Sequence, residues 1–412
     1  MKTIEREFLP VLLASDINTY SLARTFHEEY SVKSIVIGKT GGGPSANSKI
    51  IDFRTHPHLD EEETFEKVIS AVSKEFNDKT IFLIGCGDSY VRLIGKNKNQ
   101  LPKNVIAPYV DFQKMETLMN KEKFYALCDK YDLPYPKTFI YRKSMGQDYN
   151  LQFGFPVIIK PTNGVEYWDH PFRDQKKVYK ADNQNELEKI IKGIYGSGYA
   201  GNLILQDFVP GDDTYMRVLT CYSDKTGKVK LAALGHVLLE EHTPHGLGNH
   251  AVIINEDNEK LVAKLRAFLD SIGYVGFSNF DIKYDERDNT FKVFEVNVRQ
   301  GRSNYYVTGA GANLAKYLVE DYLLNKKLDF TSVKNKTLFL VVPQKVAFDY
   351  VRSPSLRAEM RALITAGRAV NPLFYPGDYG FKRLGYLARN QLSHFVKFRR
   401  YYRGAGANLY CI

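Results

Sequence analysis

The chain has 412 residues, of which 44% are hydrophobic and 25% are charged, and its formal net charge is +10. This length suits roughly two to four packed domains, and the composition excludes a disordered or collagen-like chain. No apolar run approaches the roughly 18 residues of a membrane-spanning helix, so we expect none. The four cysteines are scattered without metal-like spacing, which is typical of reduced thiols and indicates a cytoplasmic protein.

Short apolar runs alternate with amphipathic segments in the amino-terminal part of the chain. Strands are predicted over 9–14, 34–37 and 80–85, and helices over 20–30 and 62–76. This alternation favours an α/β fold class with a small, doubly wound parallel sheet. The ligand-facing edge of such a sheet is formed by the loops after its strands, here at 15–18, 38–45 and 85–88.

The pattern then becomes a mixture of helices and strands. A lysine-rich helix is predicted over 114–131, and strands over 155–160 and 203–209 flank a further helix. Strands dominate from 215 to 298, and the chain beyond residue 331 is basic, aromatic and expected to be largely helical. We therefore predict an amino-terminal α/β domain at 1–112, two central subdomains at 113–200 and 201–330, and a basic carboxy-terminal segment at 331–412.

Two strands around a polar turn form the most informative segment. If the turn is centred on Asp288, Asp281 lies opposite Glu295. Since side chains alternate along a strand, Glu295, Asn297 and Arg299 share one face, and Asp281 joins it. Two carboxylates and an amide oxygen are hard ligands that suit Mg²⁺, and the arginine would neutralise an anion beside the metal. The alternative is a pair of exposed strands whose polar faces only meet water.

Asp281, followed by the run Phe-Glu-Val-Asn-Val-Arg at 294–299, resembles the metal-binding signature of the ATP-grasp superfamily. Further pieces occur in the order of that family. The resemblance implies the ATP-grasp fold, ATP and Mg²⁺ as cofactors, and Asp281, Glu295 and Asn297 as metal ligands. It also implies five nucleotide-binding residues: Lys121 and Lys160 at the phosphates, Gln206 and Val209 at the adenine, and Asp213 at the ribose.

A narrower resemblance concerns the segment 295–306, the opening 10–18 and the loop 163–168, which look like the D-aspartate ligases of Gram-positive bacteria. It implies a carboxylate-amine ligase that joins the β-carboxyl of D-aspartate to the lysine ε-amine of a UDP-linked muramyl pentapeptide. One departure is the loop after Lys160, which contains only Gly164 where a glycine-rich lid is common. A ligase for another acid or amine and a non-catalytic ATP-binding regulator are the alternatives.

The expected reaction converts a carboxylate to an acyl phosphate, which an amine then attacks. Lys121, Lys160 and Arg299 would offset the phosphate charge, and Arg299 or backbone amides near Gly301 would stabilise the tetrahedral oxyanion. For the α-carboxylate of the amino acid, the candidates are Arg217 and Arg302, with Ser303 beside them, because an arginine fork suits that group. Ordinary surface arginines are the alternative.

Two further features leave several interpretations open. His236, His242, His245 and His250 cluster in sequence and suit a zinc site, a substrate loop or a solvated loop. From residue 344 to the end, the chain has twelve basic residues and three acidic ones, interleaved with aromatic residues. That mixture suits the pyrophosphate of a nucleotide-sugar precursor, an anionic membrane surface or a solvated basic face. No recognised nucleic-acid motif accompanies the charge, so we expect no nucleic-acid partner.

Overall fold

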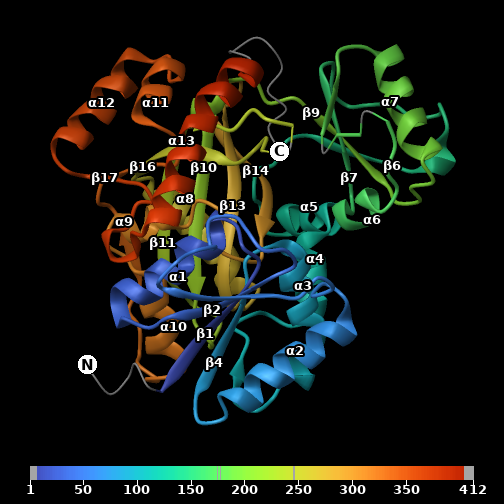
Figure 1. Ribbon diagram of the computed structural model, residues 1–412. Coiled ribbons are helices and arrows are strands. Elements are labelled where there is room, and N and C mark those ends of the chain that lie inside the picture. The colour runs from blue at the N-terminus through green and yellow to red at the C-terminus, as the bar shows by residue number, and fades with distance from the viewer. Residues whose placement is uncertain (1–6, 174, 177, 245, 403–412) are drawn as a thin grey trace.

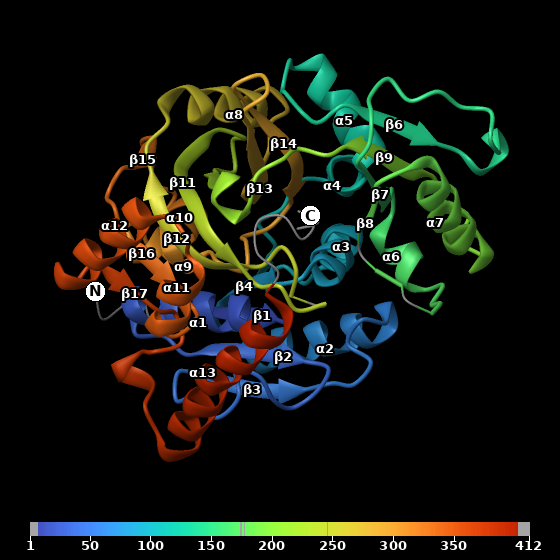
Figure 2. The ribbon, with the colours of Figure 1, turned by 90° about the horizontal axis from the view of Figure 1, so that it is seen from above.

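Figure 1 shows the computed structural model of the chain, which describes residues 7–173, 175–176, 178–244 and 246–402. Over these residues, three β-sheets form the framework, with five, eight and four strands. The four-stranded sheet stands to one side of the two larger sheets (Figure 1). The view from above in Figure 2 shows the same separation.

The amino-terminal sheet is parallel, with the strand order β3-β2-β1-β4-β5. Its strands are β1 (Phe8–Leu13), β2 (Ser34–Gly38), β3 (Ile51–Thr55), β4 (Thr80–Gly85) and β5 (Val105–Ile106). Its helices are α1 (Ile17–Tyr30), α2 (Glu62–Glu75) and α3 (Asp88–Asn97). All of β1 is buried, as its central position requires. The predicted doubly wound sheet is confirmed, and β3 and β5 add edge strands that the apolar runs did not reveal.

The antiparallel four-stranded sheet has the order β6-β9-β7-β8. Its strands are β6 (Thr138–Tyr141), β7 (Val157–Pro161), β8 (Tyr179–Ala181) and β9 (Leu203–Asp207), with α6 (Gly164–Trp168) and α7 (Gln184–Gly196). The single helix predicted over 114–131 is wrong, because α4 (Phe112–Met119) and α5 (Lys121–Lys130) are separate. The side chain of Asn120 caps α5 by accepting a hydrogen bond from the Lys123 backbone N–H. This break places Lys121 in the first turn of α5.

The eight-stranded sheet has the order β14-β13-β10-β11-β12-β16-β17, and β15 pairs with β11. Its strands are β10 (Met216–Ser223), β11 (Val229–Glu240), β12 (His250–Glu256), β13 (Gly276–Asp285), β14 (Thr290–Asn297), β15 (Thr331–Val333), β16 (Leu338–Leu340) and β17 (Ala369–Val370). The associated helices are α8 (Glu259–Ser271), α9 (Tyr305–Gly309) and α10 (Leu314–Tyr322). Asp281 pairs with Glu295 as predicted, and a bulge beside Asp281 changes the register toward the turn.

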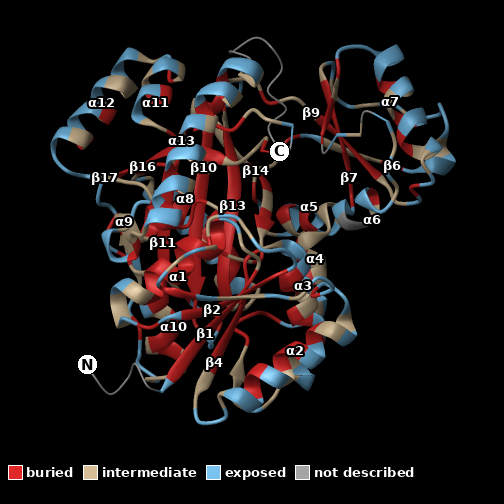
Figure 3. Cartoon of the chain, in the orientation of Figure 1, coloured by how far each residue is buried: buried red, intermediate tan, exposed pale blue. Residues whose placement is uncertain are grey.

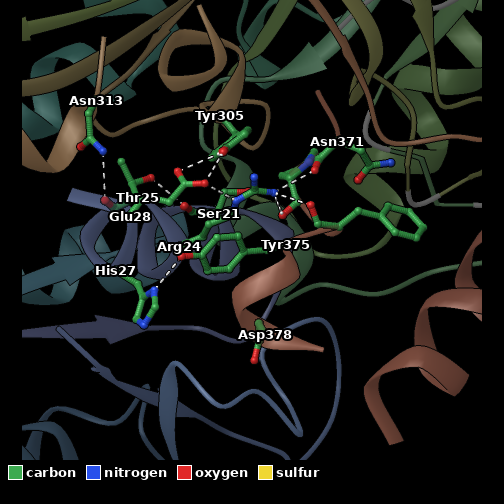
Figure 4. A network of polar contacts seen from close by, with 12 residues as sticks. Ser21, Arg24, Thr25, His27, Glu28, Tyr305, Asn313, Asn371, Tyr375 and Asp378 are labelled. Carbon is green, nitrogen blue, oxygen red and sulfur yellow. Dashed lines mark hydrogen bonds and ion pairs between the residues drawn. The ribbon is translucent and has the colours of Figure 1, made fainter. Parts of the chain in front are cut away.

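The carboxy-terminal part is helical, with α11 (Gln344–Tyr350), α12 (Pro354–Thr365) and α13 (Phe381–Tyr401). Arg24 of α1 anchors this part by donating hydrogen bonds to the carbonyl groups of Asn371, Pro372 and Phe374 (Figure 4). A second anchor is Arg383, whose Nε lies 2.9 Å from Asp378 Oδ2, with both side chains fully buried. The segment is therefore packed into the fold.

Burial is continuous through the two larger sheets, and the helices shield them on the outside (Figure 3). Strand β9 begins just after residue 200 and pairs with β6 and β7, whereas β16 and β17 extend the eight-stranded sheet from beyond residue 330. The division into four segments stays a prediction. Strand pairing in two of the sheets crosses its boundaries at 200/201 and 330/331. Within the described ranges, no helix is both long and apolar enough to cross a membrane.

Candidate active site

A cavity of about 370 Å³ lies where α5, β7, α6 and the end of β14 meet. Five of the predicted site residues line it: Lys121, Lys160, Glu295, Asn297 and Arg299. They come from three segments of the chain that are far apart in sequence. Trp168, half-exposed on α6, lines the same cavity. The fold thus brings the expected phosphate-binding lysines to the polar face of the hairpin.

Lys121 and Glu295 form an ion pair inside this cavity. Lys121 Nζ donates to Glu295 Oε2 at 2.6 Å, and both side chains are largely buried. Burial acts to lower the pKa of Lys121, but the adjacent Glu295 carboxylate outweighs it and the pKa is raised. The lysine therefore stays cationic at neutral pH, as a phosphate ligand must.

The predicted hairpin face is held by a chain of hydrogen bonds. Asn297 Nδ2 donates to Asp281 Oδ2 at 3.0 Å, and Arg299 Nη2 donates to Asn297 Oδ1 at 3.3 Å. Asp281 is buried, whereas Glu295 and Asn297 border the cavity. Their carboxylate and amide oxygens are the hard donors that Mg²⁺ prefers, so this set fits the ion by its chemistry.

Asp88 was missed as a site residue. Arg299 donates to it twice, from Nε at 2.6 Å and from Nη2 at 3.1 Å. Burial acts to lower the pKa of Arg299, but Asp88 and Asp281 outweigh it and the pKa is raised. Asp88 begins α3 directly after β4, at the sheet edge where ligand contacts are expected, and that position was the available signal.

Lys160 belongs to a buried polar chain on the other side of the cavity. Its Nζ donates to Gln206 Oε1 at 3.2 Å and lies 4.8 Å from the centre of the Phe294 ring. The Gln206 amide donates in turn to the hydroxyl of Tyr125 at 3.0 Å and to that of Thr138 at 2.8 Å. Gln206 therefore fixes the lysine through its side chain, which the sequence did not suggest.

Gly301 lies where the backbone passes close to the hairpin. A Cβ atom at this position would lie 2.5 Å from Asn279 Oδ1, so only glycine fits without displacing Asn279. The segment around it contacts the first turn of α1, because Asn304 Nδ2 donates to Asn18 Oδ1 and Asn18 Nδ2 donates to the Gln300 carbonyl at 3.4 Å. Two of the three segments that carried the narrower resemblance, 10–18 and 295–306, are thus in contact.

The other predicted residues do not line this cavity. Val209 is in the core, Ser303 is buried, and Asp213 accepts a hydrogen bond from the Glu240 N–H. Arg217 forms an ion pair with Glu256, and Arg302 Nη1 lies 3.2 Å from Glu241 Oε1. Burial lowers the pKa of Arg217, against the opposing effect of Glu256. The roles expected for these residues stay predictions.

His236, His242 and His250 contact different polar groups in the structure. His236 Nε2 lies 2.7 Å from the Thr214 carbonyl oxygen, and His242 Nε2 lies 3.0 Å from Asp213 Oδ2. His245 lies outside the described residues. Over the described ranges, no group of three or more His, Cys, Asp and Glu residues could hold a metal ion, so no zinc site is seen there.

Comparison with known proteins gives a relative that spans nearly the whole chain. The chain is 39% identical to a D-aspartate ligase from Enterococcus faecium, over 97% of this chain and 98% of that protein. No protein-family profile matches the chain.

Solved structures share the fold at low sequence identity. An N5-carboxyaminoimidazole synthetase from Staphylococcus aureus aligns with a TM-score of 0.59 at 12% identity, over 86% of this chain and 87% of that one. An L-amino acid ligase from Bacillus licheniformis aligns with a TM-score of 0.54 at 16% identity, over 76% of this chain and 74% of that one.

Proposed function

The chain belongs to the D-aspartate ligase family, has the ATP-grasp fold and is an ATP-dependent, amide-forming ligase, and we propose that its acyl donor is D-aspartate. The bond formed joins the β-carboxyl of D-aspartate to the lysine ε-amine of a UDP-linked muramyl pentapeptide, a peptidoglycan precursor. Similarity to a D-aspartate ligase along nearly the full chain carries this proposal. The reaction takes place in the cytoplasm, where the three buried free thiols among the described residues stay reduced.

The nucleotide lies in the cavity between α5, β7 and β14. Lys121 and Lys160 contact its phosphates, and Arg299 offsets the charge that develops during transfer of the γ-phosphoryl group. The adenine lies toward Gln206 and Val209 and the ribose toward Asp213. The contacts of Lys160 with Gln206 and Phe294 support this arrangement, because they hold the ammonium group before the nucleotide arrives.

Glu295, Asn297 and Asp281 supply the oxygen ligands for magnesium. The ion would neutralise the phosphate oxygens when bound. Glu295 is held by Lys121 and Asn297 by Asp281, so the donors have fixed positions. These contacts order the ligands on the hairpin, and the Lys121 ammonium group offsets the charge of the Glu295 carboxylate.

The chemistry requires no nucleophile from the protein. A carboxylate oxygen of the amino acid attacks the γ-phosphorus, and ADP leaves. The amine then attacks the acyl carbon, loses a proton to solvent, and expels phosphate as the amide forms. Arg299 and the backbone N–H groups near Gly301 stabilise the oxyanion of that second step. For the α-carboxylate, Arg302 with Ser303 is favoured over Arg217. Both arginines pair with a glutamate, but the Arg302 side chain is 37% exposed whereas that of Arg217 is 12% exposed.

A hydroxylamine-trapping screen across D- and L-amino acids tests the acyl donor. We expect an aspartyl hydroxamate only with D-aspartate and ATP, and release of ADP and phosphate with D-aspartate and the lysine-containing precursor together. Glu295→Gln should lower turnover by at least about a thousandfold. Glu286→Gln is the matched control, because this exposed carboxylate lies in the turn of the same hairpin.

Equal or better turnover with L-aspartate or D-alanine contradicts the proposed donor and leaves the general ligase. Turnover with D-aspartate and a free small amine, but not with the muramyl peptide, contradicts the proposed acceptor. Wild-type turnover of Glu295→Gln at limiting magnesium contradicts the assignment of the metal ligands.

A further inference from the structure

Helix α13 has a buried face and an opposite exposed face. Arg383, Leu387, His394 and Phe398 are buried against the protein. Five large apolar side chains on the other side are exposed, and they are Phe381 at 97%, Leu384 at 45%, Leu392 at 66%, Phe395 at 37% and Val396 at 68%. At 100° per residue they fall within about 120° of the helix circumference, Phe381 and Leu384 in the first turn and the other three in the second half. Figures 1 and 2 place α13 along the outside of the molecule.

This stripe holds most of the exposed apolar bulk of the described chain. Eight large apolar side chains are exposed over the described residues, and five of them lie on α13. A sixth, Phe374, lies in the connection that leads to the helix. Contiguous apolar groups of this kind mark an interaction surface, whereas scattered ones do not.

A basic stripe runs beside the apolar one. Lys382, Arg389 and Arg400 are exposed, and at 100° per residue they fall on the same side of the helix. The helix contains no acidic residue. Among the residues that the structure describes, none of these three cations has a salt-bridge partner. The only cation of α13 that forms an ion pair there is the buried Arg383.

We infer that α13 lies in the headgroup region of an anionic lipid leaflet, with its apolar stripe inserted and its basic stripe against the lipid phosphates. A surface helix with bulky apolar residues on one side and Lys and Arg next to them is suited to that position. A second copy of the chain fits the surface less well, because it would bring another acid-free basic helix to it.

Helix α13 is fixed to the rest of the protein by buried contacts. Arg383 pairs with the buried Asp378, and the Arg383 guanidinium lies 3.9 Å from the centre of the Tyr20 ring. The helix can therefore contact a membrane without leaving the protein. Its 21 residues span about 30 Å, which is long enough for several turns to contact the leaflet at once.

Vesicle co-sedimentation with the full-length protein tests the inference. The vesicles are phosphatidylcholine alone, or phosphatidylcholine with roughly one third phosphatidylglycerol. The triple variant Lys382→Gln, Arg389→Gln and Arg400→Gln removes three exposed charges from the helix. The matched control removes three exposed charges elsewhere, at Lys74, Lys103 and Lys192, each also replaced by Gln.

We expect the wild type to bind the anionic vesicles at low salt and to be released at high salt. The helix triple variant should lose about 100-fold in its partition coefficient, and the control should stay within about threefold of the wild type. The double variant Phe381→Ser and Leu392→Ser should lose about tenfold, and this loss should persist at high salt. Unchanged thermal midpoints show that the variants are folded, because all of these side chains are exposed.

Three results overturn the inference. The first is no binding of the wild type to anionic vesicles at low salt. The second is an equal loss of binding in the helix triple variant and its control, which shows a response to net charge alone. The third is a dimer by light scattering that Phe381→Ser dissociates without any vesicle binding, which shows that a second copy covers the face.

Discussion

Asp88→Asn isolates the contact that joins the amino-terminal sheet to the proposed phosphate site. It keeps the size of the side chain but removes the negative charge and replaces one of the two acceptors of Arg299 with an amide that cannot accept. Each hydrogen bond of a bidentate, charge-assisted pair that is shielded from solvent contributes about 1.5–3 kcal/mol of stabilisation. The Asp88 side chain is 48% exposed, so screening reduces the loss to about 1–2 kcal/mol in total.

That loss corresponds to about a tenfold fall in turnover if Arg299 acts in phosphoryl transfer. The assay is ADP release under saturating ATP, D-aspartate and lysine-containing precursor, measured for Asp88→Asn, Arg299→Lys and the double variant. We expect the two effects to be non-additive, because Asp88 acts only through Arg299. The control is Glu75→Gln, which breaks a bidentate pair of similar exposure with Arg54, and its turnover should be unchanged.

Three results refute this reasoning. Fully additive effects of Asp88→Asn and Arg299→Lys show that the carboxylate does not act through the arginine. A rise in the turnover of Asp88→Asn shows that Asp88 holds Arg299 away from the substrate instead of positioning it. A fall of the same size in the Glu75→Gln control shows that the assay reports stability instead of positioning.

Asp378→Asn leaves the fully buried guanidinium of Arg383 without its counter-charge, and should lower the free energy of unfolding by about 3–5 kcal/mol in urea titrations. Gly301→Ala forces Asn279 to move, and turnover should fall about tenfold while the fold is retained by circular dichroism. Burial lowers the pKa of His394 to about 4, below its unfolded value, so stability is full above pH 6.5 and is lost as pH falls toward 4. The loss is about 2 kcal/mol at pH 5, and His394→Gln should flatten the unfolding profile over that range.

The hairpin could be predicted because its pattern is local. Alternation along two adjacent strands fixes which side chains share a face, and the short turn sets the register from Asp285–Thr290 to Ile282–Val293. The bulge beside Asp281 could not be predicted, since the alternation of apolar and polar residues along the two strands contains no signal for it. Without the bulge, the register of the turn would place Asp281 opposite Phe294, so the bulge brings Asp281 opposite Glu295.

Partners that are distant in sequence could not be predicted. The pairing of Asp88 with Arg299 spans 211 positions, and no local period indicates it. The break between α4 and α5 had a local signal in Asn120, a strong capping residue, but the continuous run of helix-forming residues outweighed it. That break matters for the site, because it places Lys121 in the first turn of α5, from which its ammonium group contacts Glu295.

The composition of the basic carboxy-terminal segment predicted its charge but not which of its cations are exposed. A net charge says nothing about which cations are solvated, and here Arg383 is fully buried while Arg389 and Arg400 are exposed on the same helix. Removal of the second half of α13 would expose the core around Phe398 and would report stability, not surface chemistry. Substitution of exposed side chains is therefore the only probe that separates the two roles of this helix, as an anchor of the fold and as a surface for a partner.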